Sequence, residues 1–347
     1  MPTTRSSSNW TSFGEGPAVA DDAADPLPPE PPRCRQPLPK CPEEMIPLLN
    51  KSQFDPGECL AFLDAALEAA EGNSELLQGY IMLYMNRFFV FYWHKKLTVV
   101  ELQYSDAGNL ASYLVCAETH VRSMLSNVKF QVPWNRKLAD VSKIHKEDPR
   151  RLTVKALEFK PNSSILFDNG VMNTFCGIAC LRQPAAPGAI NEALFEPLMK
   201  QLRRLCGADA MVAVPFFLDI LAWILQKRRK PQVAVFFMSD DHGVGKGLLL
   251  NGMIRHLFGN THSISFNGPP PLRNNCNAQL ADKLFLFIDE AGANLTKSEC
   301  EGLKHHITEP DLEVRRMHCN PVTTTDHSFM CFAADHIKGV SRSKLLI

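Results

Sequence analysis

The stretch MSDDHGVGKGLLL, residues 238–250, places a glycine-rich turn and a lysine between two apolar segments. The residues before the turn, PQVAVFFM (231–238), predict a short buried strand. The residues after it, GLLLNGMIRHLF (247–258), have the pattern of a helix. A glycine turn between a strand and a helix can direct backbone N–H groups at a phosphate. The stretch therefore predicts either a phosphate-binding loop or a plain strand-to-helix turn.

Five residues of this turn are candidate nucleotide ligands: Gly243, Val244, Gly245, Lys246 and Gly247. Glycines allow the backbone to approach a phosphate closely, and a lysine can reach the terminal phosphates of a nucleotide. The full phosphate-loop pattern is G-x-x-x-x-G-K-[ST]. In this chain Asp240 stands where the first glycine belongs, and Gly247 replaces the hydroxyl residue. The turn alone therefore leaves both interpretations open.

Two acids end a second apolar segment, DKLFLFIDE (282–290). A buried strand here would place Asp289 at the carboxyl edge of the sheet beside the glycine turn, where its carboxylate can hold Mg²⁺ through water. Glu290 would then polarise the attacking water in the hydrolysis of a phosphoanhydride. The alternative is a strand that simply ends in solvated acids. The order of the two segments along the chain favours nucleotide hydrolysis.

Buried strands alternate with helices through the C-terminal half of the chain. Helices are expected over 192–206, 214–226 and 297–307, and a third buried strand over 328–335. This alternation predicts an α/β fold with a parallel sheet that is covered by helices on both faces.

The N-terminal half has a different character. Residues 1–40 contain nine prolines and many small polar residues, so we expect them to be disordered. A helix is expected over 55–72 with Asp55 as its N-cap, followed by two strands over 87–104 and another helix over 110–126. The expected domains are a disordered tail (1–43), a small α+β accessory domain (44–150), a connector with helices (151–205) and a phosphate-loop NTPase core (206–347).

The composition is that of a globular protein without an overall basic excess. Basic and acidic residues are balanced at 37 each, so a contact with nucleic acid has to come from a local patch. The 11 cysteines are scattered and odd in number, as expected of free thiols in a reducing compartment. No secretory signal is visible, and the longest apolar stretch (212–225) contains Pro215 and Asp219 and is shorter than the ~20 residues of a membrane span. We expect a buried helix there, in an intracellular protein that does not cross a membrane.

Four segments together resemble the superfamily 3-type helicase domain of phage and plasmid primase–helicases, the group named after the NrS phage polymerase. NTFCG (173–177) is similar to that family's Asn-x-Trp-x-Gly segment, with Phe175 in place of the tryptophan. The stretch 219–247 is similar to its Trp-Leu-Ala, Gln-x-Pro and G-x-G-K-G sequence. NAQLADKLFLFIDEA (277–291) is similar to its segment that ends in Asp-Glu-Ala, and LKHHITEPDLEVRRM (303–317) to its Leu-Lys-x-x-Ile-Thr-Glu segment. The upstream hairpin unit also resembles the small domain that precedes this helicase core.

The resemblance implies an AAA+-like ATPase that uses ATP and Mg²⁺ and assembles as a ring, usually a hexamer, around single-stranded DNA. It also implies that Lys246 contacts the β and γ phosphates, that Asp289 holds magnesium and that Glu290 is the catalytic base. The candidate DNA-binding residues, in the segment that lines the central pore of related helicases, are Lys304, Arg315 and Arg316. The implied function is an ATP-dependent DNA helicase or ATPase module of a viral or mobile-element replication protein.

Several departures from the family pattern favour a second hypothesis. Besides Asp240 and Gly247, the asparagine that senses the γ-phosphate at the end of the third strand corresponds here to Asp335. The chain ends at Ile347, before the family's downstream arginines and lid. The alternative is therefore a decayed, truncated phosphate-loop fragment that binds nucleotide or partners without efficient turnover. A small-molecule kinase is disfavoured because the chain shows no acceptor-site signature.

Three further features also have two interpretations. The basic run QKRRK (226–230) is either a solvated helix end or a DNA contact. His305 and His306 are expected to form a surface pair rather than a metal site. The aromatic run FFVFYW (88–93) is expected to belong to the core of the small domain rather than to a base-stacking surface.

Overall fold

The computed structural model describes residues 37–93, 97–132, 138–181, 192–239, 243–268, 270–271, 276–290, 297–315 and 321–334. The chain falls into two units, residues 1–33 and 34–347, and every described residue belongs to the second unit. Most of the tail that we expect to be disordered lies outside the described residues.

The helices are α1 (Ile46–Leu49), α2 (Pro56–Ala69), α3 (Ser74–Phe88), α4 (Glu118–Met124), α5 (Val141–Glu147), α6 (Glu192–Cys206), α7 (Ala210–Lys227), α8 (Arg255–Phe258) and α9 (Lys297–Thr308), and a π-helical segment, η4 (Leu248–Ile254), runs into α8. The strands are β1 (Phe89–Trp93), β2 (Leu97–Tyr104), β3 (Leu110–Ala117), β4 (Lys129–Gln131), β5 (Leu138–Asp140), β6 (Thr153–Val154), β7 (Ala156–Glu158), β8 (Phe167–Asp168), β9 (Val171–Asn173), β10 (Ala234–Met238), β11 (Ser263–Asn267), β12 (Phe285–Asp289), β13 (Asp311–Val314), β14 (Val322–Thr325) and β15 (Phe329–Ala334).

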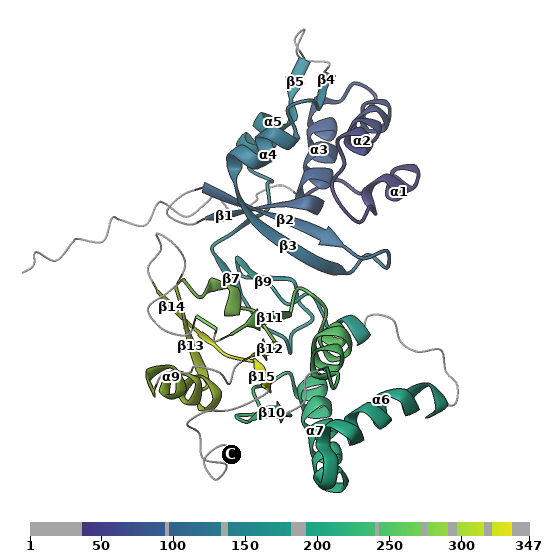
Figure 1. The fold of residues 1–347 in the computed structure, drawn as a ribbon. Helices are drawn as coiled ribbons and strands as arrows, with labels where there is room; N and C mark the ends of the chain where they lie inside the picture. The colour runs from purple at the N-terminus through teal and green to yellow at the C-terminus, as the bar shows by residue number, and fades with distance from the viewer. Residues whose placement is uncertain are drawn as a thin grey trace, which may run out of the picture. The chain divides into compact units, whose positions relative to one another are not determined.

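A largely antiparallel sheet packed with helices forms the N-terminal part of the described chain (Figure 1). β2 pairs antiparallel with both β1 and β3, and β6 joins the free side of β1 in parallel, so the two strands expected over 87–104 are confirmed. α2 begins as expected, because the Asp55 carboxylate accepts a 2.9 Å hydrogen bond from the backbone N–H of Glu58. This bond satisfies one of the unpaired donors of the first turn. Phe88, Phe89 and Phe91 are buried, as expected of core residues.

One prediction in this part was wrong, and one helix was missed. The single helix expected over 110–126 is instead β3 followed by α4, because β3 pairs residue by residue with β2, from Thr98 opposite Ala117 to Gln103 opposite Ser112. Pairing with a neighbouring strand overrides local propensity. The sequence analysis also missed α3, although six of its buried residues recur at helical spacing, namely Leu77, Tyr80, Ile81, Tyr84, Met85 and Phe88.

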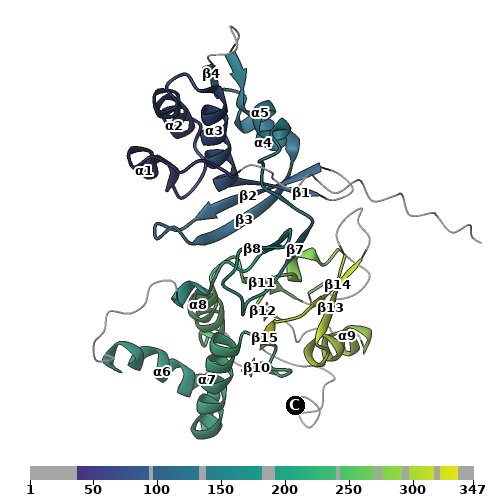
Figure 2. The same ribbon diagram turned by 180° about the vertical axis from the view of Figure 1, so that it is seen from behind.

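A second sheet has four parallel strands in the order β10-β15-β12-β11. Its side chains alternate between two apolar clusters. Phe285 and Phe287 of β12 pack in the cluster that contains residues of α7 and α8, whereas Leu286 and Ile288 pack in the cluster that contains residues of α9 and β13. Figure 2 shows α7 and α8 on one side of β12 and α9 on the other. The two central strands, β12 and β15, are buried on both faces, as is typical of parallel sheets. The mixed α/β fold and the three strands expected in this half are confirmed.

The helix expected over 212–225 is buried on one face only. Phe217, Leu221 and Ile224 of α7 pack in the core, but Met211 is 88% exposed and Trp223 is 46% exposed. A helix with apolar residues on every side is expected to be buried, so the sequence could not reveal that one face of α7 is exposed. By length and composition alone the helical stretch Ala193–Lys227 could cross a membrane, a test that a core helix also meets.

Candidate active site

The glycine turn joins the carboxyl end of β10 to η4. Gly243 and Gly245 have φ of 72° and 91°, in the left-handed region that side chains other than glycine rarely adopt. Gly247 is already helical, with φ −63° and ψ −38°, and the backbone N–H of Leu249 donates to the carbonyl of Gly245 at 3.0 Å. The strand, turn and helix thus follow one another in the order that the sequence predicts.

Asp289 lies directly beside this turn. It is the last residue of β12, and an ideal Cβ atom placed on Gly247 would lie 3.8 Å from its Oδ2 atom. Its Oδ1 atom accepts a 3.1 Å hydrogen bond from the backbone N–H of Glu290. Glu290 has φ of 53°, an unfavourable conformation for a residue with a side chain. Backbone strain of this kind, of order 1–3 kcal/mol, is common at functional sites.

One pocket of about 320 Å³ brings the turn and the two acids together. The described residues that line it are Gly243, Val244, Gly245, Lys246, Gly247, Leu248, Asp289, Glu290, Ala333 and Ala334. Lys246 is 9% exposed, and its Nζ atom lies 3.4 Å from the carbonyl oxygen of Ser239. The backbone N–H of Ser239 in turn donates to the carbonyl of Ala334 at 3.3 Å. The pocket therefore lies where the carboxyl ends of β10, β15 and β12 meet.

The remaining candidate residues that the structure describes do not line this pocket. Lys304 is exposed on α9. Arg315, just after β13, is also exposed, and its Nε atom lies 2.5 Å from the carboxylate of Glu313. Arg316, Asp240 and Asp335 lie outside the described residues. Asp335 directly follows β15, whose last two residues line the pocket.

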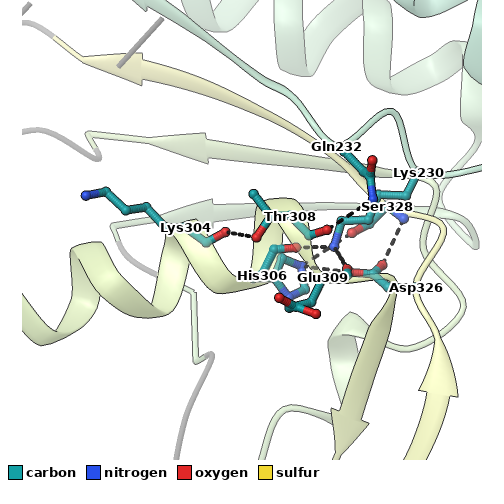
Figure 3. Close-up of polar contacts among 8 residues, drawn as sticks. All are labelled: Lys230, Gln232, Lys304, His306, Thr308, Glu309, Asp326 and Ser328. Atoms are coloured by element: carbon teal, nitrogen blue, oxygen red, sulfur yellow. Dashed lines mark hydrogen bonds and ion pairs between the residues drawn. The ribbon is translucent and has the colours of Figure 1, made fainter. Parts of the chain in front are cut away.

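The basic run 226–230 is partly built into the core, which neither interpretation of the sequence foresaw. Lys230 forms an ion pair with Asp326, 2.7 Å apart, and both side chains are less than a tenth exposed (Figure 3). Arg228 donates to the carbonyl of Pro161 at 2.6 Å and lies over the ring of Phe175. Of the four cations in the run, Lys227 and Arg229 are exposed, whereas Arg228 and Lys230 are partly buried.

The expectation that His305 and His306 form a surface pair was wrong for His306. His306 is 6% exposed, and its Nε2 atom lies 3.3 Å from the Asp326 carboxylate (Figure 3). Burial lowers the pKa of His306 to about 4; Asp326 opposes this shift and Lys230 adds to it. His305 is exposed. The contacts join segments that are about 20 to 100 residues apart, so no local sequence pattern could have indicated them.

Gln201 is a residue near the site that the sequence analysis missed. It belongs to α6, and its side-chain amide donates a 2.6 Å hydrogen bond to the carbonyl of Val244 in the glycine turn. Only a tertiary contact identifies it, because nothing in the sequence of α6 marks Gln201.

Within the described part of the chain, no group of three or more His, Cys, Asp or Glu side chains could hold a metal ion. Among the described residues of the pocket, Asp289 and Glu290 have carboxylates that could bind a metal ion together with oxygens from a ligand or water. Such sparse protein ligation is typical of Mg²⁺ at nucleotide sites.

Comparison with known proteins gives limited results. Residues 237–344, which include the whole lining of the pocket, match the model of a family of unknown function (DUF5906). No curated protein matches the chain.

Solved structures of the NrS-1 C-terminal region have a similar fold. An apo structure of residues 305–718 is 18% identical to this chain, with a TM-score of 0.55. The match covers 74% of this chain and 56% of the NrS-1 chain. An A-form apo structure is 17% identical with a TM-score of 0.54 and the same coverage. A further A-form apo structure is 18% identical with a TM-score of 0.51. This chain thus spans little more than half of each of these structures, and at this identity the likeness shows the fold alone.

Proposed function

We propose that this protein binds ATP with Mg²⁺ in the pocket at the glycine turn and hydrolyses it. The observation that carries the proposal is the convergence of a glycine turn, one lysine and two adjacent acids at the carboxyl ends of neighbouring parallel strands. Ligands of open α/β sheets bind at this edge. A pocket of about 320 Å³ lies within the range of ligand sites.

Each residue has a defined part in the proposed chemistry. Backbone N–H groups of residues 243–247 and the start of η4 bind phosphate oxygens, and Lys246 adds a positive charge. Asp289 fits a magnesium site because its carboxylate lies against the turn, at van der Waals distance from a Cβ built on Gly247. Bound magnesium supplies neutralisation of the phosphate charge. Glu290 orients the attacking water and accepts its proton.

The cellular role that we propose is DNA replication in a virus or mobile element. Its support is the four-segment resemblance to phage and plasmid primase–helicases, together with the fold that the chain shares with the NrS-1 C-terminal region. In this role the protein assembles as a ring around single-stranded DNA, and Lys304, Arg315 and Arg316 contact the phosphate backbone.

A second candidate function is nucleotide binding without efficient turnover. Gly247 favours it, because the residue beside Asp289 has no hydroxyl group that could help to hold magnesium. The presence of Glu290 in the lining of the pocket favours hydrolysis.

Replacing Lys246 tests the binding site. Lys246→Ala removes a charge-assisted contact worth about 1.5–3 kcal/mol, so the affinity for ATP with Mg²⁺ should fall roughly tenfold to a hundredfold. The measurement is titration calorimetry with the full chain. Lys200→Ala, which removes an exposed lysine on α6, is the matched control and should bind as the parent does. Equal affinities for the parent and Lys246→Ala would contradict the proposal.

A further inference from the structure

The glycine turn is held from outside the pocket by α6. The Gln201 amide nitrogen donates to the carbonyl oxygen of Val244 at 2.6 Å, and Gln201 is not part of the pocket lining. An ideal Cβ atom on Gly245 would lie only 2.5 Å from the same nitrogen. The side chain of Gln201 therefore covers the back of the peptide that links Val244 to Gly245.

This contact fixes the direction of one backbone N–H group. The described peptides include no cis bonds, and in a trans peptide the carbonyl oxygen and the following N–H point in opposite directions. Because the oxygen of Val244 points toward Gln201, the N–H of Gly245 points away from Gln201. Val244 and Gly245 both line the pocket, whereas Gln201 does not.

A side-chain contact that fixes this peptide is needed because the residues of the turn themselves restrict backbone rotation only weakly. Gly243 and Gly245 have no side chain to restrict rotation of the peptides between them. A flipped peptide would present the carbonyl oxygen of Val244 to a phosphate, and two partial negative charges would then repel each other. α6 itself is anchored, since the neighbouring Leu202 is completely buried in the core cluster that includes α7.

We propose that Gln201 is a positioning residue for phosphate binding: it locks the Val244–Gly245 peptide with the N–H of Gly245 directed at the nucleotide phosphates. This inference rests on the proposed function. The loss of one hydrogen bond to a neutral acceptor predicts a decrease in affinity of roughly threefold to tenfold.

The test uses Gln201→Met, which keeps the length and shape of the side chain but cannot donate. Titration with ADP and, separately, with pyrophosphate should show the same threefold to tenfold loss for both ligands, with an unchanged melting temperature. Gln226→Met, on the exposed side of α7, is the control and should bind both ligands as the parent does. Parent-like affinity in Gln201→Met would overturn the inference, and an equal loss in the control would do the same.

A second measurement keeps this inference distinguishable from the proposed function. The ¹³C chemical shift of the Val244 carbonyl, measured by NMR without nucleotide, should change in Gln201→Met because the hydrogen bond is lost. An unchanged shift would overturn the inference whatever the ligand affinities. A parent protein that binds neither ADP nor pyrophosphate would instead overturn the proposed function, even where the carbonyl shift changes.

Discussion

Gly247 lacks the side chain that would otherwise lie beside the carboxylate of Asp289. Gly247 has ordinary helical dihedral angles, so a serine there would cause no backbone strain. Its Cβ atom would lie at ordinary contact distance, 3.8 Å, from Asp289 Oδ2. The hydroxyl would thus stand where the full phosphate-loop pattern has one, next to the acid that we assign to magnesium.

Gly247→Ser should therefore strengthen nucleotide binding only when magnesium is present. We expect a roughly threefold to tenfold higher affinity for ATP with Mg²⁺ and no change in EDTA, because the gain comes from one added metal contact. Titration calorimetry in both buffers measures this. Gly247→Ala is the matched control, since it adds the Cβ atom without the hydroxyl. If serine and alanine behave alike in Mg²⁺, the hydroxyl position is not part of a metal site.

Among the elements, α9 shows how a helix end can be fixed by a buried ion pair. The Lys230 ammonium donates to the carbonyl oxygens of His306 and Glu309, at 2.9 Å for Glu309, and so satisfies acceptors that the end of α9 leaves unpaired (Figure 3). Its charge is balanced by Asp326, whose side chain is 2% exposed and also accepts a 2.9 Å hydrogen bond from the backbone N–H of Ser328. The cluster joins α9, which carries Lys304, to the start of β15.

Lys230→Met should destabilise the protein strongly. It leaves the Asp326 carboxylate buried without its partner, a change that costs about 3–5 kcal/mol of unfolding free energy. The double variant Lys230→Met/Asp326→Asn should recover part of this loss, because the buried charge is removed as well. Urea unfolding gives the free energies. Lys304→Met, on the exposed face of α9, is the control and should stay within about 0.5 kcal/mol of the parent. If Lys230→Met also stays within about 0.5 kcal/mol of the parent, the buried ion pair between Lys230 and Asp326 does not stabilise the end of α9.

At the scale of the whole molecule, the sequence predicts those features of the fold and of the candidate site that depend on short segments. The strand-turn-helix order around Lys246 and the acid-ended strand before Glu290 follow from short segments, and the structure places both in one pocket. The sequence does not predict features that depend on contacts between segments far apart in the chain. β3 became a strand by pairing with β2, Lys230 entered the core through Asp326, and Gln201 reaches the turn from α6. The left-handed backbone of Glu290 likewise has no sequence signal.

Binding of single-stranded DNA is a prediction about the assembled protein. Reversing the charges of Lys304, Arg315 and Arg316 to glutamate should weaken binding to a single-stranded oligonucleotide. It should also reduce the salt slope by ~0.7 for each phosphate contact that is lost. Fluorescence anisotropy at several salt concentrations measures both quantities. Lys129, Lys143 and Lys200, reversed together, give a control with the same change in net charge at exposed positions elsewhere. If the two triple variants are indistinguishable, the assigned residues are not the DNA-binding surface.

The most direct test of the central claim is single-turnover hydrolysis of ATP with Mg²⁺ by the parent and by Glu290→Gln. Glutamine keeps the shape of the side chain but cannot accept a proton, so Glu290→Gln should bind ATP as the parent does and hydrolyse it roughly 10²–10⁴ times more slowly. Hydrolysis at the parent rate by Glu290→Gln would contradict the assignment of the catalytic base. A parent that binds ATP with Mg²⁺ but releases phosphate no faster than a protein-free solution would contradict hydrolysis itself and favour nucleotide binding without turnover.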